Sequence, residues 1–584
     1  MIRSFHLRLA SIVLPLLCAL VGSAENAAAP AGKPVLDPPT LRSLGGYWIV
    51  QGDDDRDATV TAAYRKHGST EWKPALPFFR VARDAKPGKG QLEVPAGSWL
   101  FAGSVLLLDP DSEYEIKLTL VDPDGGKAEE VLKQRTIAEP VIATGAPRKH
   151  VVPGDGGGAG TKDDPFKGLA AAQAAAKPGD VMVLRAGNYG PLFAITTSGE
   201  PGKPIVWQGA GDGDVVIGTG TKEAPSERAI VIENQHDVWL QKLTVGHAGF
   251  GVLIGDSSRV VIQRCRFFDI RTRGITFCRN GTGTTSGFFI SDNVLEGASA
   301  WPRSQGIEDM NAIHGTGYGH EICYNRISGF ADAIDTFGSA SSYSIDIHNN
   351  DVSELTDDGI ELDYTQRNNR CYLNRITNAY QGISVQPVLG GPAYIVRNAL
   401  YNVCVEPFKM HNSPSGSVVL HNTIVKKERA NVVMTSAPIL TSYFRNNLFI
   451  GTDSDRPAID FDCPTTDCDF DYNGYGFGKT SGAMKWNNVR YATLDEVKQK
   501  APIEKHATFV EAATAFASGI VPPADEKVQA KIGNDLRLKE GTAAIDAGQP
   551  LANVNDGFAG KAPDLGAYEF GAELPHYGPR PEKK

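Results

Sequence analysis

Acidic residues crowd into one short stretch of this sequence, and the crowding points to chemistry. The stretch contains Asp332, Asp335, Asp357, Asp358, Glu361 and Asp363. Carboxylates that lie together are costly unless a proton or a cation offsets their charge. Ligands that are all oxygen suit calcium. We therefore predict that these carboxylates bind Ca²⁺ or act directly in catalysis. The alternative is a set of exposed charges paired with the arginines between positions 367 and 375.

A lysine follows the same local pattern as the last of these acids. Lys409 comes after Pro407-Phe408, as Glu361 comes after Gly359-Ile360. An ordinary lysine has a pKa of about 10.4 and is no base at neutral pH, but a nearby divalent cation lowers that pKa. We predict a catalytic group of Lys409, Asp358 and Glu361, with Lys409 as a base. A solvated strand lysine is the alternative.

An asparagine repeat predicts the fold that positions these residues. Asparagines recur at intervals of 25, 24, 24, 24 and 25 residues, at Asn325, Asn350, Asn374, Asn398, Asn422 and Asn447. Cys265 and Asn293 extend the series upstream. Short strands at this period form a coil of stacked rungs. We therefore predict an all-β fold, a right-handed parallel β-helix, in which stacked asparagines satisfy backbone groups between rungs.

A second strand in each repeat should carry the polar face. Its small-apolar steps are Gly274-Ile275, Ala312-Ile313, Ala333-Ile334, Gly359-Ile360, Gly382-Ile383, Pro407-Phe408 and Val432-Val433. Because side chains alternate along a strand, the apolar residue points into the coil and its neighbours point out. The next residues then form a column of Thr276, His314, Asp335, Glu361, Ser384, Lys409 and Met434. We predict that Arg273, His314, Gln381, Gln386 and His411 bind substrate beside it.

The chain divides into four regions. Arg3 and Arg8 precede an apolar run and small residues, which predicts a signal peptide at 1–24 and a secreted or periplasmic protein. Alternating strands predict a β-sandwich at 35–138. The β-helix is expected at 150–455, with a cap helix at 166–176 that shields its first rung. Residues 456–584 are expected to form the end of the β-helix and its C-terminal cap.

The overall charge limits the partners. A formal net charge of −10 argues against nucleic acid, and an acidic polymer would need local bases or a bound cation. Beyond the leader, no segment is long and apolar enough to span a membrane. We expect a monomer. Cys463 and Cys468 could pair across a short loop, and no cysteine-histidine spacing suggests zinc.

The acidic run and the lysine resemble those of the family-nine polysaccharide lyases, which are β-helical, pectate-lyase-like enzymes. Asp335, the run Asp357-Asp358-Gly359-Ile360-Glu361 and Phe408-Lys409 carry the resemblance, with Glu361 where the family has Asp. The resemblance implies calcium binding by the acids and proton abstraction by Lys409. Separately, Leu108 to Tyr114 resembles the Leu-x-Pro-x-x-x-Tyr corner of fibronectin type III domains, which implies a spacer or binding module.

Three functions remain open from the sequence. The first is a calcium-dependent lyase that cleaves an extended, acidic polysaccharide by β-elimination. The second is an inverting glycoside hydrolase with an acid and a base drawn from Asp335, Asp358 and Glu361, which needs neither calcium nor lysine. The third is a non-catalytic solenoid that binds carbohydrate at a surface.

Overall fold

The structure is a computed structural model of the chain. It describes residues 26–81, 92–218, 221–277, 285–303, 310–337, 342–427, 432–434, 437–452, 456–477 and 483–582. The expected signal peptide lies outside these residues. In the described part of the chain, no helix is long and apolar enough to cross a membrane.

The N-terminal region is a sandwich of two antiparallel sheets around its own apolar core. One sheet contains β1 (Ala29–Pro30), β2 (Val35–Leu36), β3 (Leu44–Gln51), β6 (Phe79–Val81) and β7 (Ser98–Val105). The other contains β4 (Thr59–Lys66), β5 (Lys73–Pro74), β8 (Glu113–Val121) and β9 (Lys127–Arg135). The backbone N–H of Asp109 donates to the Tyr114 hydroxyl at 3.0 Å, a corner of the kind found in such sandwiches.

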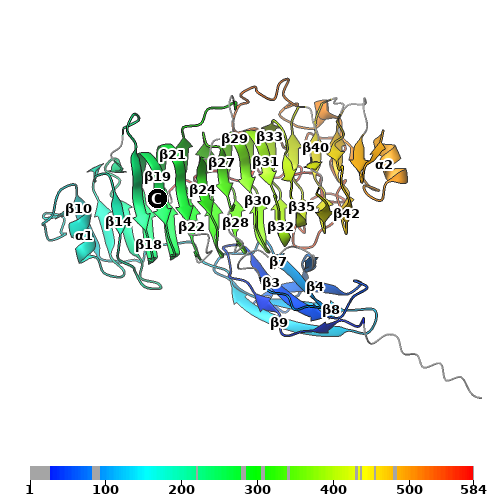
Figure 1. Ribbon diagram of the computed structural model, residues 1–584, viewed down its shortest axis with the longest axis horizontal. Helices are drawn as coiled ribbons and strands as arrows, with labels where there is room; N and C mark the ends of the chain where they lie inside the picture. Colours follow the sequence, from blue (N-terminus) through cyan, green and yellow to red (C-terminus); the bar gives the residue numbers. More distant parts are fainter. Residues whose placement is uncertain are drawn as a thin grey trace, which may run out of the picture.

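The rest of the chain forms a parallel β-helix, and the sandwich lies against its side (Figure 1). One long wall carries the predicted polar face, and we call it the polar sheet. Its strands are β13 (Gly187–Asn188), β14 (Phe193–Ile195), β16 (Val215–Ile217), β17 (Ser226–Ile232), β19 (Thr244–Ile254), β21 (Arg266–Phe277), β23 (Val294–Gly297), β24 (Asn311–Gly315), β26 (Arg326–Ser328), β27 (Asp332–Asp335), β29 (Asp351–Glu361), β31 (Arg375–Ser384), β33 (Ala399–Val403), β34 (Phe408–Met410), β36 (Thr423–Val425), β37 (Val432–Met434), β40 (Leu448–Ile450), β41 (Ile459–Asp460), β44 (Gly474–Gly476), β45 (Met484–Trp486), β46 (Val489–Tyr491) and β47 (Thr508–Phe509).

A second wall faces the sandwich, and we call it the docking sheet. Its strands are β10 (Arg148–Val152), β11 (Phe166–Lys167), β12 (Val181–Leu184), β15 (Ile205–Gly209), β18 (His236–Gln241), β20 (Ser258–Gln263), β22 (Phe289–Ser291), β25 (Glu321–Cys323), β28 (Asp346–His348), β30 (Asn369–Tyr372), β32 (Leu389–Val396), β35 (Ser415–Leu420), β38 (Ile439–Leu440), β39 (Tyr443–Arg445), β42 (Thr465–Thr466) and β43 (Asp469–Asp471). Strands β6 and β7 of the sandwich contact β32.

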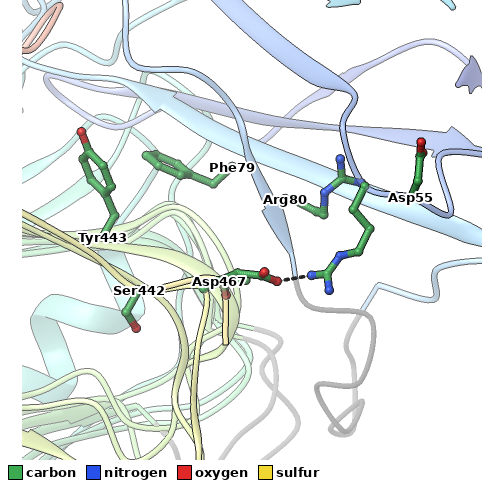
Figure 2. A pocket seen from close by; sticks show the side chains of 8 residues that line it. Asp55, Phe79, Arg80, Ser442, Tyr443 and Asp467 are labelled. Carbon is green, nitrogen blue, oxygen red and sulfur yellow. Dashed lines mark hydrogen bonds and ion pairs between the residues drawn. The ribbon is translucent and has the colours of Figure 1, made fainter. Parts of the chain in front are cut away.

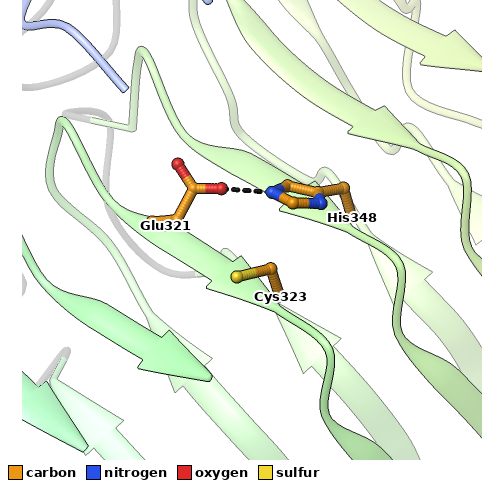
Figure 3. Close-up of side chains that lie close together, drawn as sticks. All are labelled: Glu321, Cys323 and His348. Atoms are coloured by element: carbon orange, nitrogen blue, oxygen red, sulfur yellow. Dashed lines mark hydrogen bonds and ion pairs between the residues drawn. The ribbon is translucent and has the colours of Figure 1, made fainter. Parts of the chain in front are cut away.

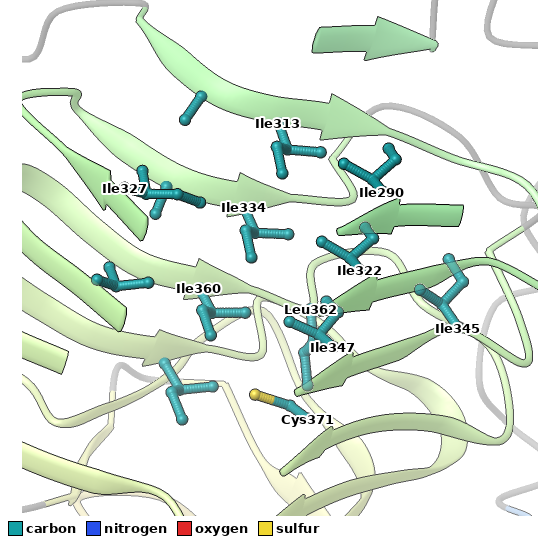
Figure 4. Close-up of a cluster of buried hydrophobic side chains, with 14 of the residues drawn as sticks. Ile290, Ile313, Ile322, Ile327, Ile334, Ile345, Ile347, Ile360, Leu362 and Cys371 are labelled. Carbon is teal, nitrogen blue, oxygen red and sulfur yellow. The ribbon is translucent and has the colours of Figure 1, made fainter. Parts of the chain in front are cut away.

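Branched aliphatic side chains fill the coil between the two walls. Figure 4 shows Ile313, Ile334 and Ile360 of the polar sheet facing Ile322 and Ile347 of the docking sheet. Parallel strands buried on their inner side favour β-branched residues, which pack well on a pleated surface. The apolar column that the sequence predicts is therefore confirmed as the core.

The predicted asparagine ladder is also confirmed. In each step, the Oδ1 atom of one asparagine accepts the backbone N–H and the Nδ2–H of the asparagine one rung earlier, as Asn374 does for Asn350 at 3.1 and 2.9 Å. Cys265 donates its N–H to Asn293 at the upstream end. Asn473 continues the ladder beyond Asn447, and Glu504 takes the next position.

The ends of the coil are closed by short elements. The predicted cap helix is α1 (Leu169–Ala175), whose Leu169 and Ala172 belong to the core. At the other end, the hairpin of β45 and β46 and the helix α2 (Leu494–Lys500) supply Trp486 and Val497 to the core.

The segment expected to form the C-terminal cap is placed differently. Leu538 and Tyr568 pack on the side of earlier rungs, against Val425 and Leu448. The chain then runs back along the coil, where Glu582 accepts a hydrogen bond from Lys242 at 2.9 Å (Figure 1). The suggested disulfide is also absent, because Cys463 and Cys468 are both free.

Candidate active site

Strands β24, β27, β29, β31 and β34 bring the predicted polar column together. Ile313, Ile334, Ile360, Ile383 and Phe408 are consecutive Cα partners inside the coil. The residues one position further on are partners as well, in the order His314, Asp335, Glu361, Ser384 and Lys409. The predicted register holds for these rungs. It is wrong by one residue at β37, where Val433 and not Met434 is the partner of Lys409.

Three carboxylates and a lysine form the centre of this face. Carboxylate oxygens of Asp332, Asp358 and Glu361 all lie within 4.8 Å of one another. The Lys409 ammonium donates to Asp358 Oδ2 at 2.6 Å and lies 3.9 Å from Glu361 Oε1. The side chain of Lys409 reaches back across the Ser384 rung to make these contacts. We call this group the carboxylate centre.

Burial and mutual repulsion shift the protonation of the centre. Burial, followed by the neighbouring carboxylates, raises the pKa of Asp332 and of Glu361 well above the usual range. Burial would lower the pKa of Lys409, but the charges of Asp358 and Glu361 outweigh it and raise this pKa. Without an added cation, the centre therefore favours a charged Lys409 and protons on Asp332 and Glu361.

Asp335, predicted as a metal ligand, lies beside the centre and has other partners. Its Oδ2 atom accepts a hydrogen bond from Asn311 Nδ2 at 2.7 Å and contacts His314 Nδ1 at 2.6 Å. Its Oδ1 atom accepts the backbone N–H of Phe337 at 2.6 Å. Asn311 also donates to Asp332 Oδ2 at 2.9 Å. Asp335 thus orients groups at the edge of the centre. Asp332, and not the predicted Asp335, is the third of the close carboxylates.

The predicted substrate-binding residues fall into two groups. Arg273 and His314 reach the centre through neighbours, because Arg273 Nε donates to Asn311 Oδ1 at 3.1 Å and His314 contacts Asp335. The Gln381 side chain hydrogen-bonds to Asp357, which is one of the predicted calcium ligands. Further along, Gln386 donates its backbone N–H to Asp363 at 2.7 Å, and His411 Nε2 lies 3.2 Å from Glu406 Oε2.

Asp363 and Arg303 also belong to this face, and sequence reasoning gave neither a role. Burial, with the charge of Asp358, raises the pKa of Asp363 to about 7. Arg303 NH1 lies 3.8 Å from Asp357 Oδ1, and its guanidinium sits 4.0 Å from the Tyr380 ring centroid. The strand register placed Asp363 on this face without assigning it a function. Arg303 lies in a loop between strands, where no repeat fixes its position.

Two buried carboxylate oxygens bear on whether the carboxylate centre can bind a cation. Among the described residues, Asp358 Oδ1 and Asp363 Oδ2 have no hydrogen-bond partner. Buried carboxylate oxygens normally have a partner or a metal ion. Asp358 forms an all-oxygen group with the close carboxylates of Asp332 and Glu361, of the kind that binds Ca²⁺. The residues present therefore fit the predicted ion.

A second group with metal-ligand side chains lies on the docking sheet. Figure 3 shows Glu321, Cys323 and His348, with Glu321 Oε1 bonded directly to His348 Nε2. His348 Nδ1 is 2.7 Å from Asn349 Oδ1, and Glu321 Oε2 accepts the N–H of Leu41 in the sandwich at 2.9 Å. Burial raises the pKa of the Cys323 thiol well above its usual range. Both ring nitrogens of His348 already have partners. Because Glu321 accepts from Leu41, the group joins the sandwich to the β-helix.

A cavity of roughly 440 Å³ separates the sandwich from the β-helix at another point (Figure 2). Arg56 and Asp467 form an ion pair across it, and the rings of Phe79 and Tyr443 lie 5.9 Å apart. Tyr443 belongs to the docking sheet, whereas the carboxylate centre is on the polar sheet. The cavity is therefore not part of the candidate active site.

The similarity of this sequence to protein families and to a curated relative is limited. No protein-family model matches the chain. The uncharacterized protein YwoF of Bacillus subtilis (strain 168) is 30% identical over 124 residues, which are 19% of this chain and 26% of that protein. The chain thus matches about a quarter of that relative's length.

Similar solved structures are polysaccharide-degrading enzymes. Pectate lyase Pel9A is 18% identical with a TM-score of 0.44, over 73% of this chain and 98% of that one. An alginate lyase from Paenibacillus sp. str. FPU-7 is 15% identical with a TM-score of 0.30, over 54% and 95%. A GH87 α-1,3-glucanase is 10% identical with a TM-score of 0.24, over 79% and 97%. Identities this low carry no activity over to this chain.

Proposed function

We propose that this protein is an exported, monomeric polysaccharide lyase that cleaves a uronic-acid-containing polymer by β-elimination. The observation that carries the proposal is the contact between the Lys409 ammonium and Asp358 at 2.6 Å, inside a group of buried carboxylates. A base and a cation site are two parts that this reaction needs, and this group offers a candidate for each. An elongated solenoid face also suits an extended polymer.

The cation would be held by Asp332, Asp358 and Glu361, with Asp363 adjacent. When bound, Ca²⁺ would offset the carboxylate charges, lower the pKa of Lys409 and neutralise the uronate carboxylate of the substrate. Asp335, Asn311 and His314 keep the edge of the centre in place through their hydrogen bonds. Gln381, Gln386, Arg273 and His411 are the proposed contacts of the sugar units.

Lys409 performs the proton transfer in this proposal. Its neutral amine removes the proton from C5 of the uronate unit, and the electron pair of that C–H bond forms the C4–C5 double bond. The bond from C4 to the glycosidic oxygen breaks, and that oxygen takes a proton from solvent. The product carries an unsaturated end, and no water is added across the cleaved bond.

The spacing of the carboxylates disfavours one hydrolase arrangement. An inverting glycosidase places its two carboxyl groups about 6.5–9.5 Å apart, so that a water molecule fits between them. Oxygens of Asp358 and Glu361 lie within 4.8 Å, and Lys409 bonds to Asp358. The short oxygen-oxygen approach and the bond to Lys409 do not favour an inverting role for this pair.

The test is digestion of polygalacturonate, alginate and glucuronoxylan, with calcium or with a chelator. We expect ultraviolet-absorbing unsaturated ends from at least one polymer, and none with the chelator. Lys409→Ala should lower kcat by about 10²–10⁴-fold, the usual contribution of a general base. Calcium affinity, measured by calorimetry, should survive Lys409→Ala and fall in Asp358→Asn.

Lys203→Ala is the matched control, because Lys203 is an exposed lysine far from the polar face. It should cleave at the parent rate. New reducing ends without ultraviolet absorbance would identify a hydrolase instead. Binding of a polymer without any cleavage would identify a carbohydrate-binding solenoid, and full activity of Lys409→Ala would remove the lyase mechanism.

A further inference from the structure

An exposed phenylalanine lies beside the carboxylate centre. Phe337 follows β27 and is 46% exposed, while the other apolar side chains of β27 and β29 are buried. Its backbone is fixed to the site, because its N–H donates to Asp335 Oδ1 at 2.6 Å. A single exposed aromatic residue is common on protein surfaces. The backbone of this one is bonded to a carboxylate of the polar column.

A tyrosine on the next rung packs against the Phe337 ring. Tyr364 directly follows Asp363, and its ring centroid lies 5.2 Å from that of Phe337 at an interplanar angle of 78°. Its N–H donates to Pro387 O at 2.8 Å, which fixes the loop that carries it. In an edge-to-face pair, one ring presents its edge to the other. The exposure of Phe337 shows that part of its ring surface is left open to solvent.

Further hydrogen bonds tie the two rings to the centre. Thr336 lies between Asp335 and Phe337, and its hydroxyl donates to Glu361 O at 3.3 Å and to Asp363 O at 3.0 Å. Asp335 and Glu361 are Cα partners on adjacent rungs, which are about 4.8 Å apart. The ring pair therefore stands at the C-terminal ends of β27 and β29, next to the strand positions that hold the carboxylates.

We propose that Phe337 and Tyr364 form a stacking subsite that binds the apolar face of a pyranose ring in the polymer. The subsite rests on the proposed function for its substrate class, and it adds the position of a neighbouring sugar unit. A pyranose presents C–H groups on one face, and an aromatic ring gains free energy when such apolar surface leaves water. Exposed apolar surface beside polar groups is typical of ligand-binding grooves.

The charges of the polar face and the two aromatic rings should contribute to polymer binding through different forces. Attraction between the protein and uronate groups weakens as salt is added, because exposed charges are screened. Stacking on Phe337 is an apolar contact and depends little on salt. The loss of affinity caused by removing the ring should therefore be the same factor at low and at high salt.

The test is affinity electrophoresis in native gels that contain polygalacturonate, alginate or glucuronoxylan. All variants carry Lys409→Ala, so that the polymer in the gel is not cleaved during the experiment. We expect Phe337→Ala to weaken retardation about tenfold at both salt concentrations, with the melting temperature unchanged. Phe337→Trp should keep the parent affinity. Phe509→Ala is the matched control, because Phe509 is also 46% exposed but lies in β47, near the end of the coil.

The outcomes separate this subsite from the proposed function. Equal retardation of Phe337→Ala and the parent overturns the subsite, and so does a parent that none of the three polymers retards. A weakening that disappears at high salt overturns it too, because it would show a charge effect. The lyase proposal is judged independently, by unsaturated products from the protein with Lys409 intact.

Discussion

Neutral donors between charged groups hold the candidate site together. Asn311 donates to Asp332 at 2.9 Å and to Asp335 at 2.7 Å, and its Oδ1 atom accepts from Arg273 Nε at 3.1 Å. The arginine fixes which end of the amide faces the carboxylates, since only the NH₂ group donates. Asn311 thus satisfies two carboxylates of the neighbouring strand β27 that would otherwise repel each other. Arg273 and Asn311 act on the centre by positioning.

A buried acid at the end of the ladder contributes to the pH dependence of stability. Glu504 ends the asparagine ladder, and its Oε1 atom accepts from Asn473 Nδ2 at 2.7 Å and from the Tyr475 hydroxyl at 2.6 Å. Burial raises the pKa of Glu504 from 4.5 to about 7. The folded protein therefore keeps a proton that the unfolded chain loses. The stabilisation is complete below pH 4.5 and is lost as the pH rises through about 7, a change of about 3 kcal/mol.

Glu504→Gln should remove this dependence, because the amide stays neutral at every pH. The expected result is a flatter profile of the unfolding free energy between about pH 5 and 8, measured by urea denaturation. The control is Glu540→Gln, which changes an exposed glutamate. A Glu504→Gln profile as steep as that of the parent would contradict the assignment.

The outward direction of Asp335, Glu361 and Lys409 could be predicted because each follows an apolar residue that must enter the core. Their partners could not be predicted in the same way. Asp335 shares its strand face with the ligands, yet its side chain turns to His314 and Asn311. Arg303 and Phe337 lie in loops that vary in length between rungs, and no strand alternation fixes where a loop side chain points.

At the scale of elements, the ladder sets the stacking of the rungs. Each asparagine accepts with its Oδ1 atom from the rung before it. Its Nδ2 atom donates to a backbone carbonyl of that preceding rung and to the next asparagine. This reciprocal bonding requires the same side chain at a constant interval. That is why a spacing of 24 or 25 residues predicted the coil, whereas the C-terminal tail, which has no repeat, was assigned to the wrong place.

Asn374→Ala should show the contribution of one step. It leaves the N–H and Nδ2–H of Asn350 without their acceptor, and it removes the donor to Ile347 O. Buried groups without partners cost about 1–3 kcal/mol each, so we expect a loss of about 2–4 kcal/mol in chemical denaturation. Asn188→Ala is the control, because this exposed residue accepts only within its own turn, from Gly190 N at 2.9 Å. An equal loss in both variants would argue against the ladder.

At the scale of the whole molecule, the sandwich is a fixed part of the protein and does not act as a loose spacer. Asp346 of the docking sheet accepts hydrogen bonds from Thr40 at 2.8 Å and from Ser43 at 3.0 Å in the sandwich region. At the tail, Arg580 bonds Glu139 at 2.7 Å and Asp292 at 2.8 Å. The carboxylates of Asp346 and Asp292 are buried, and their bonds link separate parts of the chain, so domain motion would break bonds that water does not replace.

Asp37→Ala should uncouple the sandwich from the β-helix. Asp37 accepts from Arg367 NH2 at 2.7 Å and from Asn368 Nδ2 at 2.7 Å, and the aspartate and arginine are only 2% and 8% exposed. Removing the aspartate leaves a buried guanidinium without its counter-ion, which costs about 3–5 kcal/mol. We expect calorimetry to resolve two transitions where the parent shows one. Asp109→Ala breaks the exposed pair with Lys66 at 3.2 Å and should cost less than about 1 kcal/mol. A single, unshifted transition in Asp37→Ala would mean that the two domains are held together elsewhere.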